Sequence, residues 1–229
     1  MNVLSSPSHL IIIGAQRAGS TWLYELLDKH PDVYMQRPQK PEPKFFLDPE
    51  WSQRDYNQQL FKNAPSDVKY WGEKSVSYYQ LPEVARRIDS CLREVKILVI
   101  LRNPVGRAIS NFRFSSQSGL ETRTIEEVFI QGAEPPSLDV RVSVNPFEYL
   151  SRGHYAEHLR AYFHKFSGRI HIIILEEALS TSVHKELWKF LNIPPISTSF
   201  ARVNASIESQ VPEEVNDILM SYYESHIGA

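Results

Sequence analysis

Two segments of this 229-residue chain combine glycine, hydroxyl and cationic residues in a way that suits anion binding. The first segment, Gly14–Thr21, contains Arg17, Gly19 and Ser20, and it separates a β-branched apolar run from a segment with helical apolar spacing. In such a loop the backbone amides and the helix N-terminus can face a bound anion. The alternative interpretation is an ordinary tight turn between a strand and a helix. The loop departs from the pattern G-x-x-x-x-G-K-[ST], because Ser20 takes the place of the lysine.

The second segment repeats this arrangement after another apolar run. Arg102 follows the run Val95–Leu101, and Ser110 lies about two helical turns later. Ligands of open α/β sheets bind at the carboxyl ends of the strands, so Arg102 and Ser110 could grip a second phosphate there. The alternative is a surface ion pair at Arg102 and a solvent-facing Ser110. No aspartate ends the strand to hold magnesium, so the two segments favour a nucleotide with two separated phosphates.

The elements that must position these segments alternate between strands and helices. We expect strands at 9–14, 69–73, 95–101 and 169–175, and helices at 21–30, 51–60, 81–92, 105–114, 125–131, 155–166, 183–191 and 211–226. The proline-rich stretch 31–49 is expected to be irregular. The alternation predicts one α/β domain over residues 1–229, with a P-loop-like three-layer α/β/α fold and a central, mainly parallel sheet.

The composition narrows the class of protein. Apolar residues make up 42% and charged residues 23%, with a net charge of −2, which excludes a disordered chain and a globally basic nucleic-acid binder. The one cysteine, Cys91, permits no intramolecular disulfide and is either an inert thiol in a helix or a nucleophile. No apolar run approaches the ~18 residues of a membrane span, and the N-terminus lacks signal-peptide features. We therefore expect a cytoplasmic protein with no membrane span and no nucleic-acid partner.

Together these segments resemble a known family. Gly14–Leu23 resembles the 5′-phosphosulfate loop of sulfotransferases that use 3′-phosphoadenylyl sulfate (PAPS), and Arg102–Ser110 resembles their 3′-phosphate motif. Three shorter segments resemble the branch typified by heparan-sulfate sulfotransferases and their bacterial relatives. Glu42–Phe46 is similar to its E-x-x-F-F segment, Gly72–Tyr78 to its E-K-S-x-x-Y segment, and Gly153–Tyr155 to its G-x-Y segment. The matches run in the order that the family has, over most of the chain.

The resemblance implies a role for individual residues. It assigns the 5′-phosphosulfate to Arg17, Ala18, Gly19, Ser20, Thr21 and Trp22. It assigns the 3′-phosphate to Arg102 and Ser110. Glu42 matches the family's catalytic base, and Lys74 matches the lysine between donor and acceptor. Arg17 stands where the family usually has lysine, and it would act with Lys74 on the sulfuryl oxygens. The cofactor implied is PAPS, with PAP as its product and no metal.

The chemistry suits these residue types. Sulfuryl transfer needs cations and amides for the spread negative charge, and a carboxylate for the acceptor's proton. For Glu42 the alternative is a solvated charge in a K-P-E-P-K stretch, and for Lys74 a surface lysine. His154 and His158 are rival bases, or a metal pair one helical turn apart, or histidines of the surface or core. The aromatic residues near these segments line an acceptor cleft, stack on adenine or pack in the core: Phe45, Phe46, Trp71, Tyr78 and Tyr79.

The sequence thus predicts transfer of a sulfuryl group from PAPS to a hydroxyl or amine, on a glycan or another small hydroxyl compound. The alternatives are a P-loop nucleotide kinase and a non-catalytic nucleotide-binding module. The segments 114–146 and 197–210, which would determine acceptor specificity, carry no clear motif, although Phe200–Asn204 resembles a late F-x-x-x-N segment of the family. The family usually runs further than Ala229, so we expect a C-terminally shortened version.

Overall fold

A computed structural model describes residues 6–50, 52–137, 145–196 and 211–227. The chain forms two compact units, which we describe separately: residues 1–101 with 156–200, and residues 102–155 with 201–229. Whether they make one domain, as the sequence predicts, stays a prediction. The segments 138–144 and 197–210, with Phe200–Asn204, lie outside the described residues. Across the ranges described, no helix combines the length and apolar character that crossing a bilayer requires.

The first unit is built on a five-stranded parallel sheet in the order β2-β3-β1-β4-β5. Its strands are β1 (Ser8–Gly14), β2 (Val33–Met35), β3 (Tyr70–Lys74), β4 (Val95–Leu101) and β5 (Ile170–Ile174). Both central strands are buried β-branched runs, as parallel strands covered on two faces should be. Four strands were predicted from these runs; β2 is a short edge strand inside the stretch expected to be irregular.

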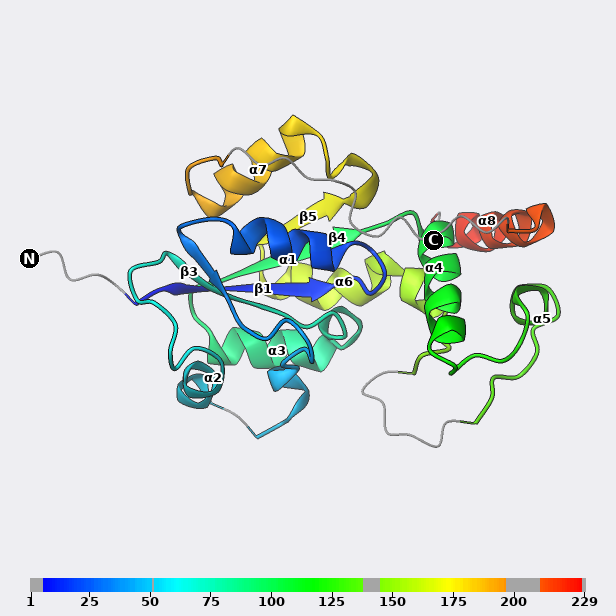
Figure 1. Ribbon diagram of the computed structural model, residues 1–229, viewed down its shortest axis with the longest axis horizontal. Coiled ribbons are helices and arrows are strands. Elements are labelled where there is room, and N and C mark those ends of the chain that lie inside the picture. Colours follow the sequence, from blue (N-terminus) through cyan, green and yellow to red (C-terminus); the bar gives the residue numbers. More distant parts are fainter. Residues whose placement is uncertain (1–5, 51, 138–144, 197–210, 228–229) are drawn as a thin grey trace, which may run out of the picture. The chain divides into compact units, whose positions relative to one another are not determined.

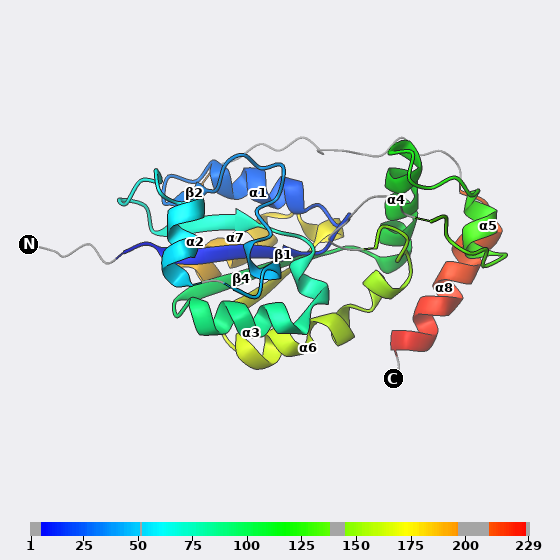
Figure 2. The same cartoon turned by 90° about the horizontal axis from the view of Figure 1, so that it is seen from below.

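Helices cover both faces of this sheet, which confirms the predicted three-layer α/β/α fold (Figures 1 and 2). The helices are α1 (Ser20–Asp28), α2 (Gln53–Leu60), α3 (Pro82–Cys91), α6 (Tyr155–Lys165) and α7 (Thr181–Leu191), with 3-10 helices η1 (Phe45–Leu47), η2 (Tyr78–Gln80) and η4 (Leu175–Glu177). Trp22 of α1 and Trp188 of α7 belong to one buried cluster with residues of β1 and β4. On the other face α3 and α6 lie side by side, joined by an ion pair between Asp89 and Lys165.

The second unit is helical. It contains α4 (Pro104–Gln117), α5 (Ile125–Phe129), η3 (Ser151–Gly153) and α8 (Glu213–Ile227). Pro104 occupies the first turn of α4, and the side chain of Asn103 caps that turn by accepting the N–H groups of Val105 and Gly106. A compact apolar cluster holds the helices together, with Ala108, Ile109, Phe112, Phe129, Tyr149, Val215 and Leu219 as its buried members.

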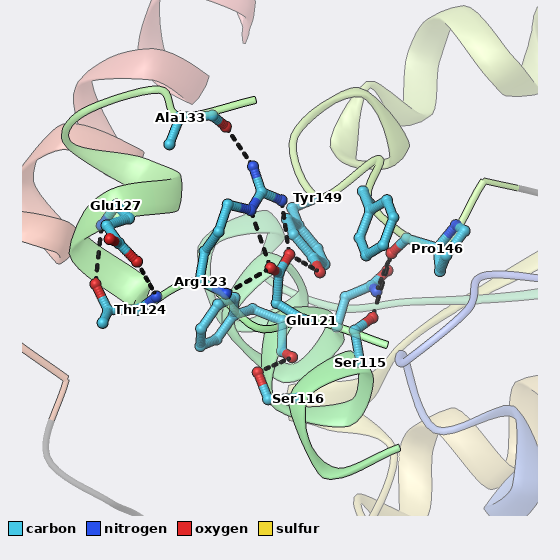
Figure 3. Close-up of polar contacts among 12 residues, drawn as sticks. Ser115, Ser116, Glu121, Arg123, Thr124, Glu127, Ala133, Pro146 and Tyr149 are labelled. Atoms are coloured by element: carbon cyan, nitrogen blue, oxygen red, sulfur yellow. Dashed lines mark hydrogen bonds and ion pairs between the residues drawn. The ribbon is translucent and has the colours of Figure 1, made fainter. Parts of the chain in front are cut away.

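A buried carboxylate fixes the chain between α4 and α5 (Figure 3). Glu121 accepts hydrogen bonds from the Arg123 guanidinium at 2.6 and 2.9 Å and from the Tyr149 hydroxyl at 2.8 Å. Arg123 also donates to the carbonyl of Ala133. Burial alone would raise the pKa of Glu121, but the bonds from Arg123 and Tyr149 outweigh it and lower that pKa. The chain between these helices, which carries no clear motif in the sequence, therefore has a specific anchor.

Two fully buried arginines, Arg107 on α4 and Arg152 on η3, tie the first half of α4 to the chain after residue 144. Arg107 and Arg152 both donate to the side-chain oxygen of Asn111, at 3.4 and 3.1 Å. Arg107 also donates to the carbonyl of Tyr149, and Arg152 to the carbonyl of Asn145. Each guanidinium thus satisfies backbone carbonyls that the irregular chain leaves without secondary-structure partners.

Candidate active site

The loop between β1 and α1 has the backbone that its glycine spacing predicts. Arg17 and Gly19 both adopt positive φ, 67° and 91°. A Cβ on Gly19 would lie 2.6 Å from Cδ1 of Leu175, so this position needs glycine for conformation and for space. Gly19 directly precedes Ser20, the first residue of α1, so the first-turn amides of α1 open at the loop.

The residues predicted for the 5′-phosphosulfate are thus consecutive at one helix N-terminus. Ala18, Ser20 and Trp22 are buried, whereas Arg17 and Thr21 are partly exposed. The loop is tied to the sheet by the Ala15 N–H, which donates to the Ile100 carbonyl at 2.7 Å. The helix dipole, the loop amides and one cation therefore belong to one short segment at the N-terminus of α1, and together they can bind an anion.

Glu42 and Lys74 form an ion pair at the same edge of the sheet. The Lys74 ammonium contacts Oε1 of Glu42, and Oε2 accepts the Val76 N–H at 3.0 Å. The side chain of Lys74 is 4% exposed and that of Glu42 is 15% exposed, so the pair is largely shielded from water. The interpretations of Glu42 as a solvated charge and of Lys74 as a surface lysine are therefore wrong.

Strand register relates this pair to the loop. Lys74, the last residue of β3, lies opposite Ile12 of β1, two residues before Gly14. The Ser75 N–H extends this pairing to the Ile12 carbonyl at 3.0 Å. A carboxylate, an ammonium and an anion-type loop therefore share the carboxyl edge of neighbouring strands, where α/β sheets bind their ligands.

Arg102 and Ser110 belong to the second unit; Arg102 precedes α4, and Ser110 lies on its second turn. A Cβ on Gly106 would lie 3.2 Å from Nε of Arg102, so the Arg102 side chain folds over Gly106. Gly106 and Ser110 are one turn apart on the same face of α4. Ser110 is buried, so the interpretation of a solvent-facing serine is wrong. The Tyr155 hydroxyl supports the Arg102 backbone by donating to its carbonyl at 2.8 Å.

Comparison with known proteins identifies the family. Residues 7–221 match the sequence profile of the family described as Sulfotransferase domain. The chain belongs to the sulfotransferase domain family. Its fold, a parallel sheet with flanking helices, is shared with other sulfotransferases of known structure. A sulfotransferase from Alicyclobacillus acidocaldarius superposes with a TM-score of 0.74 at 24% identity, covering 98% of this chain and 94% of that one.

Sequence relatives place this sulfotransferase near the heparan-sulfate branch. Human heparan sulfate glucosamine 3-O-sulfotransferase 3B1 is 29% identical over 196 residues, which cover 82% of this chain and 47% of the human protein. The bifunctional heparan sulfate N-deacetylase/N-sulfotransferase 1 of Xenopus tropicalis is 28% identical over 197 residues, covering 80% of this chain and 22% of that protein. The chain thus spans less than half of the length of these relatives.

The rival catalytic groups occupy other settings in this sulfotransferase. His154 follows η3, and its Nε2 lies 3.0 Å from the Tyr222 hydroxyl, whereas the His158 ring packs edge-on against Tyr79 at 5.4 Å. Burial raises the pKa of Cys91 to about 12, which leaves it protonated and unsuited as a nucleophile. Within the described ranges, no three His, Cys, Asp or Glu side chains gather so as to hold a metal ion.

The aromatic residues near the site are mostly core. Phe46, Tyr78 and Tyr79 are fully buried, and the partly exposed Trp71 stacks on Phe61 with centroids 5.4 Å apart. A further buried residue, Glu73, was missed because a charged residue in a short strand looks like a solvent-facing position. The available signal was its place beside Lys74. Successive strand residues point to opposite faces of the sheet, so two adjacent charged residues cannot both reach solvent when helices cover both faces.

Proposed function

We propose that this chain catalyses sulfuryl transfer from PAPS to a hydroxyl or amine of a carbohydrate, with Glu42 as the general base. The observation that carries the proposal is the Glu42–Lys74 pair at the strand edge that also bears the loop of residues 14–21. An isolated anion loop would suit many nucleotide-binding proteins. A shielded carboxylate beside it adds the proton acceptor that transfer to a hydroxyl requires.

The donor would be held through its two phosphate ends. The loop amides, Arg17 and the N-terminus of α1 would bind the 5′-phosphosulfate, and Arg102 with Ser110 would bind the 3′-phosphate. Arginine offers a planar fork for bidentate contacts, in place of the point charge of lysine. The second assignment is supported by the folding of Arg102 over Gly106, which lies one turn before Ser110 on the same face of α4.

The reaction would be an in-line displacement at sulfur. The acceptor oxygen forms the new S–O bond, the bond from sulfur to the 5′-phosphate oxygen of PAP breaks, and Glu42 takes the acceptor's proton. Glu42 uses one oxygen for Lys74 and the other for the Val76 N–H. A carboxylate offers about four lone-pair directions, so both oxygens can still accept from a hydroxyl. Lys74 and Arg17 would stabilise charge on the sulfuryl and leaving oxygens.

A carbohydrate acceptor is favoured by the names of the relatives, two of which act on heparan sulfate. We take a glucosamine-containing oligosaccharide as the first acceptor to test, with transfer of radioactive sulfur from PAPS as the readout. Binding of PAP without transfer to any member of an oligosaccharide panel would favour the non-catalytic binding module instead.

Donor binding is tested by titrating PAP in a calorimeter without magnesium. Wild type should bind, and Arg102→Ala should weaken binding by about 10- to 100-fold, because a charge-assisted hydrogen bond is lost. Arg160→Ala, which removes an exposed arginine of α6, is the matched control and should leave the affinity unchanged. If wild type ignores PAP and binds ATP with magnesium, the kinase interpretation replaces this one.

The base is tested separately by Glu42→Gln. This variant should keep PAP affinity and lose about 100-fold or more in turnover, because general base catalysis contributes at least that much. Unimpaired turnover would remove Glu42 from the mechanism and return His154 and His158 to consideration.

A further inference from the structure

Glu73 is a fully buried carboxylate that the proposed reaction does not use. Its Oε2 accepts the Ser75 hydroxyl at 2.8 Å, and its Oε1 accepts the hydroxyls of Tyr56 and Tyr78 at 3.3 and 3.4 Å. Burying a charged group carries a large desolvation cost, unless hydrogen bonds compensate for the lost water. Three hydroxyl donors offset part of that cost, two from the chain directly after Glu73 and one, Tyr56, from α2.

Two of these hydroxyls also contact the segment that carries Glu42. The Ser75 oxygen accepts the N–H of Lys44 at 3.0 Å, and the Tyr78 oxygen accepts the N–H of Phe46 at 3.0 Å. Lys44 lies two residues after Glu42 and has a positive φ of 51°, outside any regular element. These two bonds therefore fix the backbone of an irregular segment immediately after the carboxylate.

The direction of each hydroxyl hydrogen decides whether these bonds can form. A hydroxyl has one hydrogen, and if it points at Glu73 then the lone pairs remain to accept an N–H. Above pH 7, where Glu73 is ionised, its carboxylate can only accept, so it directs the Ser75 and Tyr78 hydrogens toward itself. Hydrogen bonds to a charged acceptor are also roughly twice as strong as neutral ones, which makes this orientation firm.

We infer that Glu73 is a positioning residue, whose buried carboxylate orients the Ser75 and Tyr78 hydroxyls so that both hold the backbone beside Glu42. This inference rests on the proposed role of Glu42 as base. Glu73 contacts neither donor nor acceptor in this scheme. It acts on the placement of the carboxylate that does, and a misplacement of about 1 Å in a reacting group can reduce a rate 100-fold.

The third hydroxyl supplies a matched control. Tyr56 donates to the same carboxylate oxygen as Tyr78, and its ring packs against Phe46 at 5.1 Å. Among the described contacts, however, its hydroxyl accepts no N–H from residues 42–47. Tyr56→Phe and Tyr78→Phe each delete one buried oxygen and keep the ring, but only the second removes a bond to the Glu42 segment.

Amide hydrogen exchange measures this positioning without any substrate. Ser75→Ala should speed exchange of the Lys44 amide about 5- to 10-fold, and Tyr78→Phe should do the same for Phe46, because each deletion frees one N–H. Glu73→Gln should speed at least one of the two, since its amide offers an acceptor on one side only. Tyr56→Phe should change neither. Amides of Val95–Leu101, in the central strand, correct for any change in global stability.

Kinetics with PAPS and a glucosamine-containing oligosaccharide provide the second readout. Ser75→Ala, Tyr78→Phe and Glu73→Gln should lower kcat about 10-fold or more while the KM for PAPS and the affinity for PAP stay unchanged. Tyr56→Phe should keep kcat within about twofold. Equal losses in Tyr56→Phe and Tyr78→Phe would show that the cluster acts only through stability and would overturn the inference.

The two readouts separate this inference from the proposed function. Unchanged exchange at both Lys44 and Phe46 in Glu73→Gln overturns the positioning role, whatever the enzyme transfers. Absence of any transfer by wild type overturns the proposed function, while the exchange data still decide whether Glu73 fixes the segment.

Discussion

Replacing Glu73 by glutamine should change how the stability of the first unit depends on pH. Burial raises the pKa of Glu73 from 4.5 to about 7, against the opposing effect of the hydrogen bonds from Ser75, Tyr56 and Tyr78, and the nearby charge of Glu42 raises it further. In the unfolded chain this carboxyl has an ordinary pKa. Glutamine has nearly the same shape and does not titrate.

The direction of this change in stability with pH follows from how many protons the folded and the unfolded protein bind. Between pH 4.5 and about 7 the folded protein keeps a proton on Glu73 that the unfolded chain has released. Stability from this group is therefore fully present below pH 4.5 and is lost as the pH rises toward 7. A shift of that size corresponds to about 3 kcal/mol in total, of which roughly 2 to 3 kcal/mol falls between pH 5 and pH 8.

The assay is urea unfolding followed by tryptophan fluorescence at pH 5 and pH 8. All four tryptophans of the chain, at positions 22, 51, 71 and 188, lie within the residue ranges of the first unit. The free energy of unfolding of wild type minus that of Glu73→Gln should fall by roughly 2 to 3 kcal/mol from pH 5 to pH 8. Subtraction removes the titrations that the two proteins share.

The control is Glu50→Gln, at an exposed carboxylate of the same unit. Its difference from wild type should stay nearly constant over the same pH range. A pH-independent difference for Glu73→Gln, or one that grows with pH, would refute the reasoning, because either result means that the folded protein does not hold the extra proton.

Three further experiments, with four substitutions, test the geometry of the chain. In a double-mutant cycle followed by urea unfolding, the summed destabilisation by Lys74→Met and Glu42→Gln should exceed that of the double variant by about 1 to 3 kcal/mol. The reason is that each single change leaves a shielded group without its partner. Gly153→Ala should lower the free energy of unfolding by about 1 to 3 kcal/mol, seen in calorimetry as a lower melting temperature, because the new Cβ would lie 2.5 Å from the buried Tyr223 ring. An unchanged melting temperature would mean that the ring moves freely. Gly19→Ala should weaken PAP binding in titration calorimetry by about 10-fold or more through its φ of 91°, and unchanged affinity would contradict a fixed loop.

The sequence predicts the sheet well where a strand is long and covered on both faces. The runs that became β1 and β4 are mostly apolar; one ends at Gly14 and the other is followed by Arg102, so their type follows from local pattern. The strand β2 has three residues in a proline-rich stretch, and it exists because β3 offers a free edge to pair with. This pairing of β2 with β3 depends on the tertiary fold, so no periodic pattern in the sequence predicts it.

The features of the candidate site also divide into those that the local sequence predicts and those that depend on the tertiary fold. The loop of residues 14–21 is a local structure, so its glycine spacing predicts its backbone. The pairing of Glu42 with Lys74 joins two segments 32 residues apart, and only the family resemblance pointed to both. Glu73, Ser75 and Tyr78 lie in the E-K-S-x-x-Y segment, but their hydrogen bonds to one another and to the backbone at Lys44 and Phe46 form only after folding.

The anchors of the second unit also bear on how this region can diverge. The chain between Ala133 and Asn145 is held at both ends, by Arg123 on one carbonyl and by Arg152 on the other. With fixed ends, lengthening a loop costs only loop-closure entropy, about 0.6 kcal/mol for each doubling. Arg123 and Arg152 hold the chain on either side of residues 138–144, so a change in the number of residues between these two anchors would leave the described parts of the second unit in place.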